Sequence, residues 1–436
     1  MGRALEPLSI VLDLSLLYVK SDIYGRAGIE VDFDHVVVGA GVVGAATAYH
    51  LKRLSPDADI LLMDREKRAG AGNTAKSAAL YRNIFSSEAS KVLSTSSIRY
   101  YLTLGDRVQM NPIGYLWMFS EKQWSASSDA VSSLDPEGDE VSFPDRGEIS
   151  RILNIRSDGI GPFPSIDHGI WGKLCGSLSG MGLAQHYADM FREMGGEVSL
   201  GNGMEEIVLR GRGTRHATWG EKGIDHIVDS RGEEIEARDY IFAVGARSQE
   251  ILGKLGIFTG VLPKKRQLFG IKVDDPYSVA GDIELEKVPA LILPAGGTYV
   301  KPILNRNLMI LGLAESLGQP YDMSDPTFDL EYFRKAIVPV ISHYFPRLVD
   351  YELKMKWAGY YAYHWPDKNP VVEREENIFW ASGTSGSGIM KADGIGRVTA
   401  SKALGIDTAE MFDSSKVRVS DLSLRSRNVD KESFVI

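Results

Sequence analysis

The sequence has a single cysteine, no excess of positive charge and no long apolar run. One cysteine, Cys175, excludes an internal disulfide and cannot supply a thiolate-rich metal site. The eight histidines show no ligand spacing such as HExxH, so no metal is expected. A formal net charge of −9 argues against nucleic acid as a partner, because affinity for phosphate backbones depends on clustered Lys and Arg.

A membrane-spanning stretch is also lacking. Residues 8–19 are largely apolar but are interrupted by Asp13. They are fewer than the ~20 residues that a spanning helix needs, and no convincing basic leader or cleavage site accompanies them. We expect an added surface helix or strand here, with a subunit contact as one role for it and a membrane-surface anchor as the alternative. The expected location is the cytoplasm, with peripheral membrane contact as a second option.

The chain does have enough length and apolar content for two globular domains, with 436 residues of which 44% are hydrophobic. Residues 31–38 and 59–63 read as buried strands, and residues 42–54 between them read as a helix that ends before Pro56. This order predicts a parallel β-α-β unit. Later segments alternate in type: helices are expected at 88–104, 181–194, 330–345 and 394–404, and strands at 197–200, 205–228, 240–244, 288–313 and 377–381.

The strongest local signal lies between the first strand and the first helix, where the chain reads Gly39-Ala40-Gly41-Val42-Val43-Gly44. The first glycine permits a tight turn, the second lets the backbone approach a pyrophosphate, and the third lets helix and strand pack closely. Unpaired N–H groups and the positive end of the helix dipole then meet the phosphates. Asp64, about twenty residues further on, is placed to accept hydrogen bonds from ribose hydroxyls. Together these features predict a dinucleotide site.

The choice between NAD and FAD depends on two later segments. Residues 381–391 read ASGTSGSGIMK between a predicted strand and a predicted helix. Such a turn suits a chain that returns to the first domain and lays backbone N–H groups beside a flavin ring. A third segment, the strand that ends at Gly245, needs a small residue where the chain passes a cofactor. The three segments together favour FAD.

Several motifs in this order resemble the D-amino acid oxidase superfamily of flavoproteins, in particular the branch that holds sarcosine oxidase, glycine oxidase and archaeal dye-linked L-proline dehydrogenase. The resemblance runs from about residue 36 to residue 404. It rests on VVVGAGVVGAATAYHL, on the loop that ends in Ala79-Leu80-Tyr81-Arg82, and on Gly114-Tyr115-Leu116, IFAVGARS, residues 263–267, Tyr299-Val300-Lys301-Pro302, Trp357-Ala358-Gly359, Pro366-Asp367 and GTSGSGIM.

The resemblance implies an α/β (α+β) fold with two domains and the flavin between them. A Rossmann-like FAD-binding domain would be assembled from the separated segments 31–105, 171–262 and 357–412. A substrate-binding domain with a large mixed β-sheet would comprise 106–170 and 263–356, with an N-terminal extension at 1–30 and a C-terminal tail at 413–436. The expected cofactor contacts are Gly39, Gly41, Val42, Val43, Gly44, Asp64, Arg65, Ser77, Ala78, Gly245, Gly383, Gly386, Gly388, Ile389 and Met390.

Relatives that act on amino acids hold the substrate carboxylate with a cation, and Arg82 matches an arginine with that role. A guanidinium offers a planar fork to a carboxylate and stays charged. The alternatives for Arg82 are a surface salt bridge or a contact to the flavin. A lysine makes the second carboxylate contact in the sarcosine oxidase branch; here Met390 aligns with it and Lys391 follows one place later.

Other departures from the family pattern bear on the pocket and on FAD. After Trp357-Ala358-Gly359 an aromatic run replaces an arginine of glycine oxidase, so Tyr361, Tyr363 and His364 are candidates to shape the pocket. FAD is expected to bind non-covalently, because Tyr360 lies near the position of the attachment cysteine in sarcosine oxidase.

The electron acceptor is the least defined partner. Oxidases of this branch carry a lysine near the flavin, in a strand before a glycine, where it helps oxygen accept electrons. The matching strand is expected at residues 308–312, which read Leu-Met-Ile-Leu-Gly. An apolar segment favours a dehydrogenase that passes electrons to a quinone, a dye or another protein.

The leading interpretation is an FAD-dependent dehydrogenase that transfers a hydride from a small amine or amino acid to flavin N5. L-Proline or N-methylglycine is the favoured substrate. One fold hosts many chemistries, so two alternatives stay open: a 2-hydroxy-acid or glycerol-3-phosphate dehydrogenase, and a non-catalytic flavin-binding assembly subunit. The sequence leaves the oligomeric state open, with a homodimer as one option.

Overall fold

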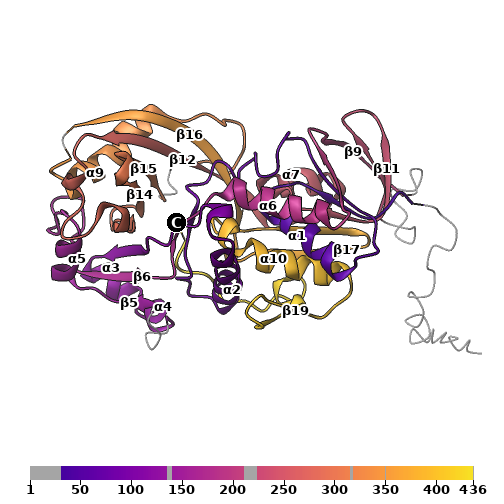
Figure 1. Cartoon of the computed structure of the whole chain (residues 1–436), viewed down its shortest axis with the longest axis horizontal. Coiled ribbons are helices and arrows are strands. Elements are labelled where there is room, and N and C mark those ends of the chain that lie inside the picture. Colours follow the sequence, from indigo (N-terminus) through magenta and orange to yellow (C-terminus); the bar gives the residue numbers. More distant parts are fainter. Residues whose placement is uncertain (1–30, 135–139, 211–222, 315–317, 349, 436) are drawn as a thin grey trace, which may run out of the picture.

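The structure is a computed structural model that describes residues 31–134, 140–210, 223–314, 318–348 and 350–435. The apolar stretch at 8–19 lies outside the described residues. Two halves lie side by side, and each is built around one large β-sheet (Figure 1). This mixed α/β architecture confirms the predicted fold class.

The first half contains a largely parallel sheet with the strand order β17-β18-β11-β1-β2-β8. Strands β18, β11, β1, β2 and β8 run parallel, β17 is antiparallel to β18, and β10 and β9 extend from β11 as an antiparallel arm. Distant parts of the chain therefore meet in one sheet. The strand bounds are β1 Phe33–Val38, β2 Ile60–Asp64, β8 Glu197–Leu200, β9 Met204–Leu209, β10 Ile224–Asp229, β11 Glu234–Phe242, β17 Val371–Glu375 and β18 Ile378–Ser382.

Both faces of this sheet are buried. Val37 and Leu62 point into the core beneath the helices, whereas Val36 and Leu61 point into the opposite core, as the two-residue period of a strand requires. Helices α1, α6, α10 and α2 lie together on one side of the sheet (Figure 1). The helix bounds are α1 Val42–Leu54, α2 Glu88–Leu104, α6 Gly180–Glu193, α7 Ser248–Leu252 and α10 Gly388–Ala403.

The predicted start is correct for α1 and six residues too late for α10. The bounds predicted for α1 agree with the structure, because Gly41 precedes it and Ser55-Pro56 ends it. Helix α10 begins at Gly388 rather than at residue 394. The glycines of the turn concealed that residues 388–393 are already helical and pack against α1 and α2. The glycine-rich turn is therefore the N-terminal approach to a long helix.

The second half contains a mixed sheet with the order β16-β12-β15-β14-β13-β4-β6-β5, in which only β13 and β4 are parallel neighbours. The elements of this half are β4 Tyr115–Phe119, α3 Glu121–Ala126, α4 Ser128–Ser132, β5 Val141–Ser142, α5 Arg146–Ile152, β6 His168–Gly172, β12 Val261–Val273, β13 Ala290–Ile292, β14 Thr298–Ile303, β15 Leu308–Leu313, α8 Leu330–Tyr332, α9 Val338–Tyr344 and β16 Tyr351–His364. Short pairs complete the fold: β3 Leu80–Tyr81 with β7 Gly176–Ser177, and β19 Thr408–Glu410 with β20 Lys416–Arg418.

Strands β12 and β16 form the longest ladder, from Val261 opposite His364 to Val273 opposite Tyr351. Sequence patterning missed both strands, because adjacent lysines and arginine in β12 and charged residues in β16 hide the alternation. The proposed domain boundaries at 262/263 and 356/357 fall inside these two strands, and the boundary at 170/171 falls inside β6. We therefore propose domain boundaries at the ends of these strands. Between α8 and α9 the single helix predicted at 330–345 contains a π-helical turn, Phe333–Ile337.

No helix within the described ranges has the length and apolar character needed to cross a membrane. The same part of the chain holds no group of three or more His, Cys, Asp or Glu side chains suited to a metal ion.

Candidate functional site

A cavity of about 1150 Å³ lies where the two halves meet. Its wall includes β1, α1 and the start of α10 from the first half, and β12, β14 and β16 from the second half. Pockets for small ligands usually have volumes of roughly 300–1,000 Å³. This cavity is therefore large enough for a dinucleotide as well as a small molecule.

The three glycines of the first motif differ in what an added side chain would contact. Gly39 has a φ of +105°, and a Cβ atom there would lie 2.7 Å from the carbonyl oxygen of Ala243. A Cβ on Gly44 would lie 1.8 Å from the carbonyl oxygen of Gly39, so this residue lets α1 pack on the turn. Gly41 lines the cavity, and a Cβ there would meet only Thr74 Oγ1 at 3.5 Å. Gly41 alone of the three leaves free space on the cavity side.

Two helix N-termini open into this cavity. Neither Gly41, before α1, nor Ser387, before α10, caps its helix with a side chain, and neither first turn contains an acidic residue. First-turn N–H groups have no partner within their own helix, and the helix dipoles add partial positive charge. The arrangement suits phosphate oxygens at α1 and the electron-rich edge of a flavin at α10.

Asp64 lies at the end of β2 and lines the same cavity. Its carboxylate accepts hydrogen bonds from the backbone N–H groups of Ala40, at 2.6 Å, and Glu66, at 2.8 Å. Burial raises the pKa of Asp64, although these two hydrogen bonds oppose the rise. A carboxylate has about four acceptor positions, so Asp64 can fix the glycine turn and still accept bonds from a ribose.

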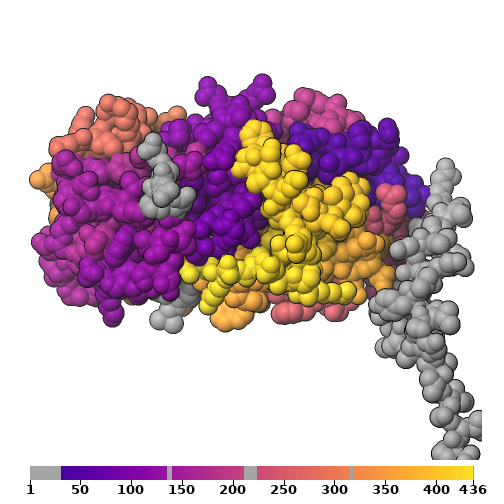
Figure 2. Space-filling model, turned by 90° about the horizontal axis from the view of Figure 1, so that it is seen from below, coloured from indigo at the N-terminus to yellow at the C-terminus, as the bar shows by residue number. Residues whose placement is uncertain are grey.

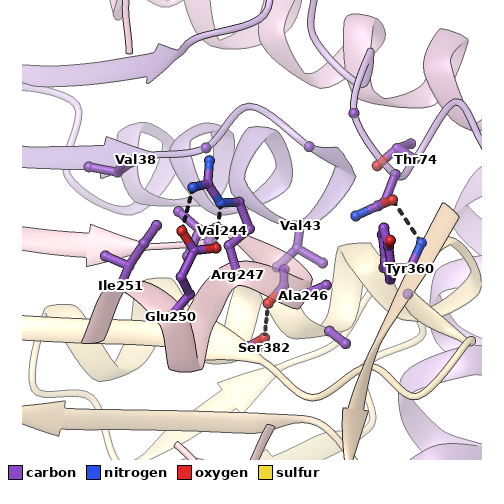
Figure 3. Close-up of a pocket in the computed structure, with 18 of the residues that line it drawn as sticks. Val38, Val43, Thr74, Val244, Ala246, Arg247, Glu250, Ile251, Tyr360 and Ser382 are labelled. Atoms are coloured by element: carbon purple, nitrogen blue, oxygen red, sulfur yellow. Dashed lines mark hydrogen bonds and ion pairs between the residues drawn. The ribbon is translucent and has the colours of Figure 1, made fainter. Parts of the chain in front are cut away.

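Gly245 and the loop before β3 complete this end of the cavity. Gly245 has a φ of +58°, and its carbonyl oxygen accepts a hydrogen bond of 2.9 Å from Ser382 Oγ, beside Val244 and Ala246 (Figure 3). The predicted cofactor residues that line the large cavity are Gly39, Gly41, Val42, Val43, Asp64, Arg65, Ser77, Ala78, Gly245, Gly386, Gly388 and Ile389. Gly44 and Gly383 lie behind its wall, where Gly44 serves helix packing and a Cβ on Gly383 would lie 3.1 Å from His364 Cβ.

A second, small cavity of about 50 Å³ lies beside the large one. A water molecule needs roughly 10–15 Å³ by this measure, so the small cavity has room for only a few waters. Tyr299, Tyr361 and Ala78 border both cavities, and Arg82 and Met390 border the small one alone. Met390 is therefore separated from the large cavity, where the sequence had placed it.

Arg82 is buried and already has partners. Its guanidinium donates hydrogen bonds to the carbonyl oxygens of Ile84 and Phe434 and lies 4.0 Å from the centre of the Phe85 ring. Phe434 belongs to residues 424–435, which we call the C-terminal segment. Arg82 thus connects the loop after β3 to the C-terminal segment.

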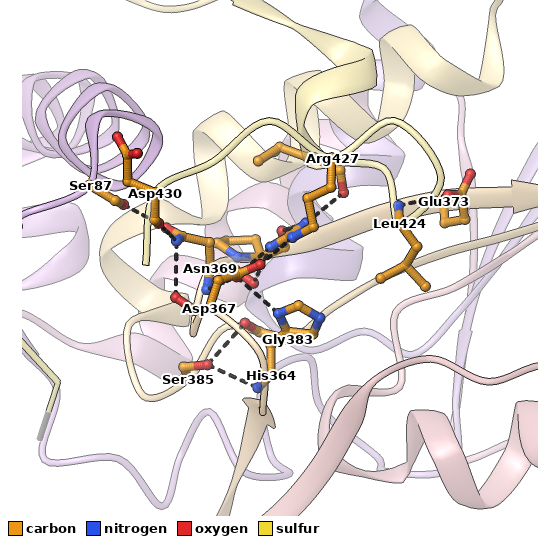
Figure 4. Close-up of polar contacts among 12 residues, drawn as sticks. Ser87, His364, Asp367, Asn369, Glu373, Gly383, Ser385, Leu424, Arg427 and Asp430 are labelled. Carbon is orange, nitrogen blue, oxygen red and sulfur yellow. Dashed lines mark hydrogen bonds and ion pairs between the residues drawn. The ribbon is translucent and has the colours of Figure 1, made fainter. Parts of the chain in front are cut away.

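The C-terminal segment is visible in yellow at the boundary between the halves (Figure 2). Arg427 donates two hydrogen bonds to the Asp367 carboxylate, and Asn369 donates one of 2.8 Å to the Asp430 carbonyl (Figure 4). The Glu432 carboxylate accepts bonds from the N–H groups that follow β3, at Ser86 and Ser87. No sequence motif marked this docking, because each contact joins residues more than fifty positions apart.

Three predicted pocket residues line neither cavity. Lys391 is fully buried, and its Nζ donates a 2.7 Å hydrogen bond to Ser90 Oγ. Burial lowers the pKa of Lys391 to about 7. Consecutive helical residues point about 100° apart, so Lys391 points away from the cavity that Met390 borders. His364 bonds to Asp367 at 3.0 Å, and Tyr363 packs on Lys264, which leaves Tyr361 as the aromatic residue of this set at the site.

Two cations at the site were not predicted from the sequence. Arg266, in β12, lines the large cavity and is 6% exposed. Its segment, residues 263–267, was part of the family resemblance, but a strand with three consecutive cations gave no sign of which one faces inward.

Lys301, in β14, is the second of these cations and corrects the expectation from the apolar strand. Strand β15 is apolar as predicted, but Lys301 lies directly opposite Ile310 on the neighbouring strand. Its Nζ donates a 2.9 Å hydrogen bond to the carbonyl oxygen of Ala78, which borders both cavities. Burial lowers the pKa of Lys301 to about 8. A lysine therefore lies beside the site, so the apolar character of β15 does not favour a dehydrogenase over an oxidase.

Comparison with known proteins identifies the same fold in flavoenzymes. The family described as "FAD dependent oxidoreductase" (DAO) matches residues 34–402. "FAD-dependent oxidoreductase domain-containing protein 1" of Xenopus laevis is 23% identical, over 84% of this chain and 78% of the relative. The Bos taurus protein of the same name is 24% identical, over 85% and 81%.

Solved structures of flavoenzymes have the same fold as this chain. L-Proline dehydrogenase from P. horikoshii superimposes with a TM-score of 0.70 at 19% identity, covering 86% of this chain and 93% of that one. Glycine oxidase from Geobacillus kaustophilus gives 0.69 at 16% identity, covering 86% and 96%. At these identities the likeness to the solved structures establishes the fold, and the substrate must be argued from the site.

Proposed function

Because this chain belongs to the FAD-dependent oxidoreductase family, we propose that it oxidises a small amine or amino acid at a C–N bond, with L-proline or N-methylglycine favoured. FAD supplies the redox chemistry when bound, since its flavin ring takes up two electrons as a hydride. We propose non-covalent attachment, because the single cysteine, Cys175, is buried and lines neither cavity.

The residues of the large cavity fit FAD. The free space at Gly41 and the uncapped N-terminus of α1 suit the pyrophosphate, and Asp64 suits the adenosine ribose. Gly386, Gly388 and the N-terminus of α10 would border the flavin ring. We assign these residues to cofactor binding on that fit.

The proposed substrate class is supported by the residues at the end of the same cavity that lies away from the pyrophosphate site. There Leu268, Tyr299 and Tyr361 provide apolar and aromatic surface next to the cation of Arg266. Aromatic and apolar walls exclude water and can hold the carbon skeleton of a small amino acid, while the cation suits its carboxylate. An amine bound in its neutral form needs no dedicated base, and none is assigned.

An anaerobic reduction screen tests this proposal. The FAD-loaded protein is mixed with L-proline, N-methylglycine and glycine, and separately with 2-hydroxyglutarate and glycerol 3-phosphate, while flavin absorbance is recorded. We expect bleaching by an amino acid. Bleaching by a hydroxy compound alone would favour the alternative dehydrogenase, and bleaching by none of them would favour a flavin-binding subunit without this activity.

A further inference from the structure

We propose that Arg266 is the residue that binds the carboxylate of the substrate, and that Arg82 instead holds the C-terminal segment in place. The inference rests on the proposed oxidation of an amino acid. It assigns the anion-binding role to a residue that the sequence did not single out.

Arg266 has an incomplete set of partners on the wall of the large cavity. Its Nη1 donates to the carbonyl oxygen of Lys265 at 3.2 Å, and its Nη2 donates to that of Ala314 at 3.1 Å. Its Nε is buried and has no hydrogen-bond partner among the described residues. A buried donor without a partner is rare. The carbon of the guanidinium lies 5.2 Å from the centre of the Tyr361 ring, which itself borders the cavity.

The charge of Arg266 is also uncompensated within the described part of the chain. None of the ion pairs found there includes Arg266, whereas its neighbour Lys265 pairs with Asp325 at 2.8 Å. A buried cation without a counter-ion is costly. An anion that enters from the cavity would supply the missing charge, and a carboxylate matches the guanidinium fork.

Arg82, by contrast, has both a negative charge nearby and carbonyl oxygens that accept its hydrogen bonds. The Glu432 carboxylate, which is 1% exposed, supplies negative charge near Arg82 and Lys391. Two carbonyl oxygens accept hydrogen bonds from the guanidinium, and the small cavity that it borders has a volume of about 50 Å³. One of these carbonyl oxygens belongs to Phe434, so a carboxylate that bound the same nitrogen of Arg82 would have to displace the C-terminal segment.

The flavin is the other anion-like group that Arg266 could serve. The N-terminus of α10 already directs positive potential toward the place expected for the flavin ring. Arg266 comes instead from the second sheet and shares its wall with Leu268 and Tyr299. The substrate carboxylate is therefore the better match, and the flavin becomes an outcome of the test.

The test measures binding without turnover. Pyrrole-2-carboxylate and pyrrole-2-carboxamide resemble an oxidised ring and cannot donate a hydride, and they differ in charge. Each is titrated into FAD-loaded protein, and perturbation of the flavin spectrum gives its Kd. Wild type should prefer the carboxylate, and Arg266→Gln should weaken that ligand roughly ten- to hundredfold, because a charge-assisted bond is lost. The carboxamide should change less than about threefold.

Two further variants sharpen the result. Arg266→Lys should recover part of the carboxylate affinity, because an ammonium keeps the charge without the planar fork. It also keeps the proposal testable if Arg266→Gln fails to fold. Arg82→Gln should change the affinities for both ligands equally.

Three results would overturn the proposal. These are an unchanged carboxylate Kd in Arg266→Gln, an equal loss for both ligands, which would assign Arg266 to the flavin or the fold, and wild type that binds neither ligand. The amine oxidation can fail independently: a flavin that no amino acid reduces, together with a charge-specific loss in Arg266→Gln, would leave the anion site standing.

Discussion

One end of the large cavity is formed mainly by backbone atoms and the other by side chains. The end proposed for the phosphates consists mainly of backbone, namely glycine Cα atoms and the N–H groups of α1. One side chain, the Asp64 carboxylate, fixes the turn. The opposite end consists of long side chains from the second sheet, among them Arg266, Tyr299 and Tyr361. A backbone site is encoded by a few adjacent residues, whereas a side-chain site is assembled from strands far apart in sequence. Substitutions at the backbone end should therefore cause loss of the cofactor. Substitutions at the side-chain end should change which substrate binds and leave the cofactor in place.

The largest expected effect on cofactor binding comes from breaking the backbone end with Gly41→Val. The φ of Gly41 is −65°, which any residue adopts, and a Cβ meets only Thr74 Oγ1 at 3.5 Å. The chain should therefore fold, while the valine side chain occupies the space proposed for the pyrophosphate. We expect FAD affinity to fall at least tenfold, about 1.4 kcal/mol or more, measured as bound flavin after desalting.

Two controls separate cofactor binding from folding in that experiment. Apo Gly41→Val should unfold at the same temperature as apo wild type. Gly44→Val should lower that temperature, because its Cβ would lie 1.8 Å from the Gly39 carbonyl oxygen. A yellow Gly41→Val protein with full FAD content would show that this glycine has only a structural role.

The difference between the two ends also explains what the sequence could predict. Residues 39–64 carried the turn, helix and acid of the backbone end within one short stretch, and the α1 bounds agreed with the structure. Arg266 could not be chosen, because three cations follow one another in β12 and only the pairing with β16 decides which faces the cavity. Lys391 points away from the cavity by one helical position, and the lysine that β15 lacks is present as Lys301 on the neighbouring strand β14. The docking of the C-terminal segment depends on contacts that no local pattern encodes.

The largest effect expected on folding stability concerns the C-terminal segment, whose Phe434 belongs to the same core cluster as Tyr299 of the side-chain end. Arg427 and Asp367 are each 13% exposed, and Arg427→Met leaves the Asp367 carboxylate buried without its charge partner. Breaking a buried pair costs about 3–5 kcal/mol. Arg425 is the matched control: it is 70% exposed and pairs with Glu375, so Arg425→Met should cost about 1 kcal/mol or less.

Chemical unfolding of the FAD-loaded variants measures these losses in free energy of unfolding. Equal losses in Arg427→Met and Arg425→Met would mean that the C-terminal segment contributes little to the fold. A drop in FAD affinity larger than the loss of stability would instead connect the segment to the backbone end.

A smaller effect is expected at Lys301, which donates a hydrogen bond to Ala78 on the cavity wall. A cation beside the flavin would stabilise the negative charge that dioxygen acquires as it is reduced. Lys301→Met should slow reoxidation of the reduced protein by dioxygen about tenfold, a barrier change of about 1.4 kcal/mol, and leave anaerobic reduction by substrate nearly unchanged. In wild type the rate should fall as the pH rises through about 8, where Lys301 loses its proton.

Stopped-flow measurement of reoxidation checks this prediction. Lys272→Met is the control, because Lys272 lies on β12 of the same sheet with its side chain 48% exposed and paired with Asp274. Equal reoxidation rates in wild type and Lys301→Met would remove Lys301 from the acceptor step.

The last effect, a dependence of folding stability on pH, tests whether Lys391 is a charged group at all. Its pKa is lowered by burial from the ordinary 10.5 to about 7. Between these values the unfolded chain keeps the proton that the folded chain has lost, so stability rises with pH across this window. Below pH 7 both states are protonated and the slope vanishes. The free energy of unfolding of wild type, relative to Lys391→Met, should therefore increase from pH 7.5 to 9.5 by up to about 1.4 kcal/mol per pH unit. Lys335→Met, at a side chain that is 78% exposed, should give a flat difference. A flat difference for Lys391 as well would mean that Glu432 keeps it protonated, and a rising one would make Lys391 a neutral amine near pH 8.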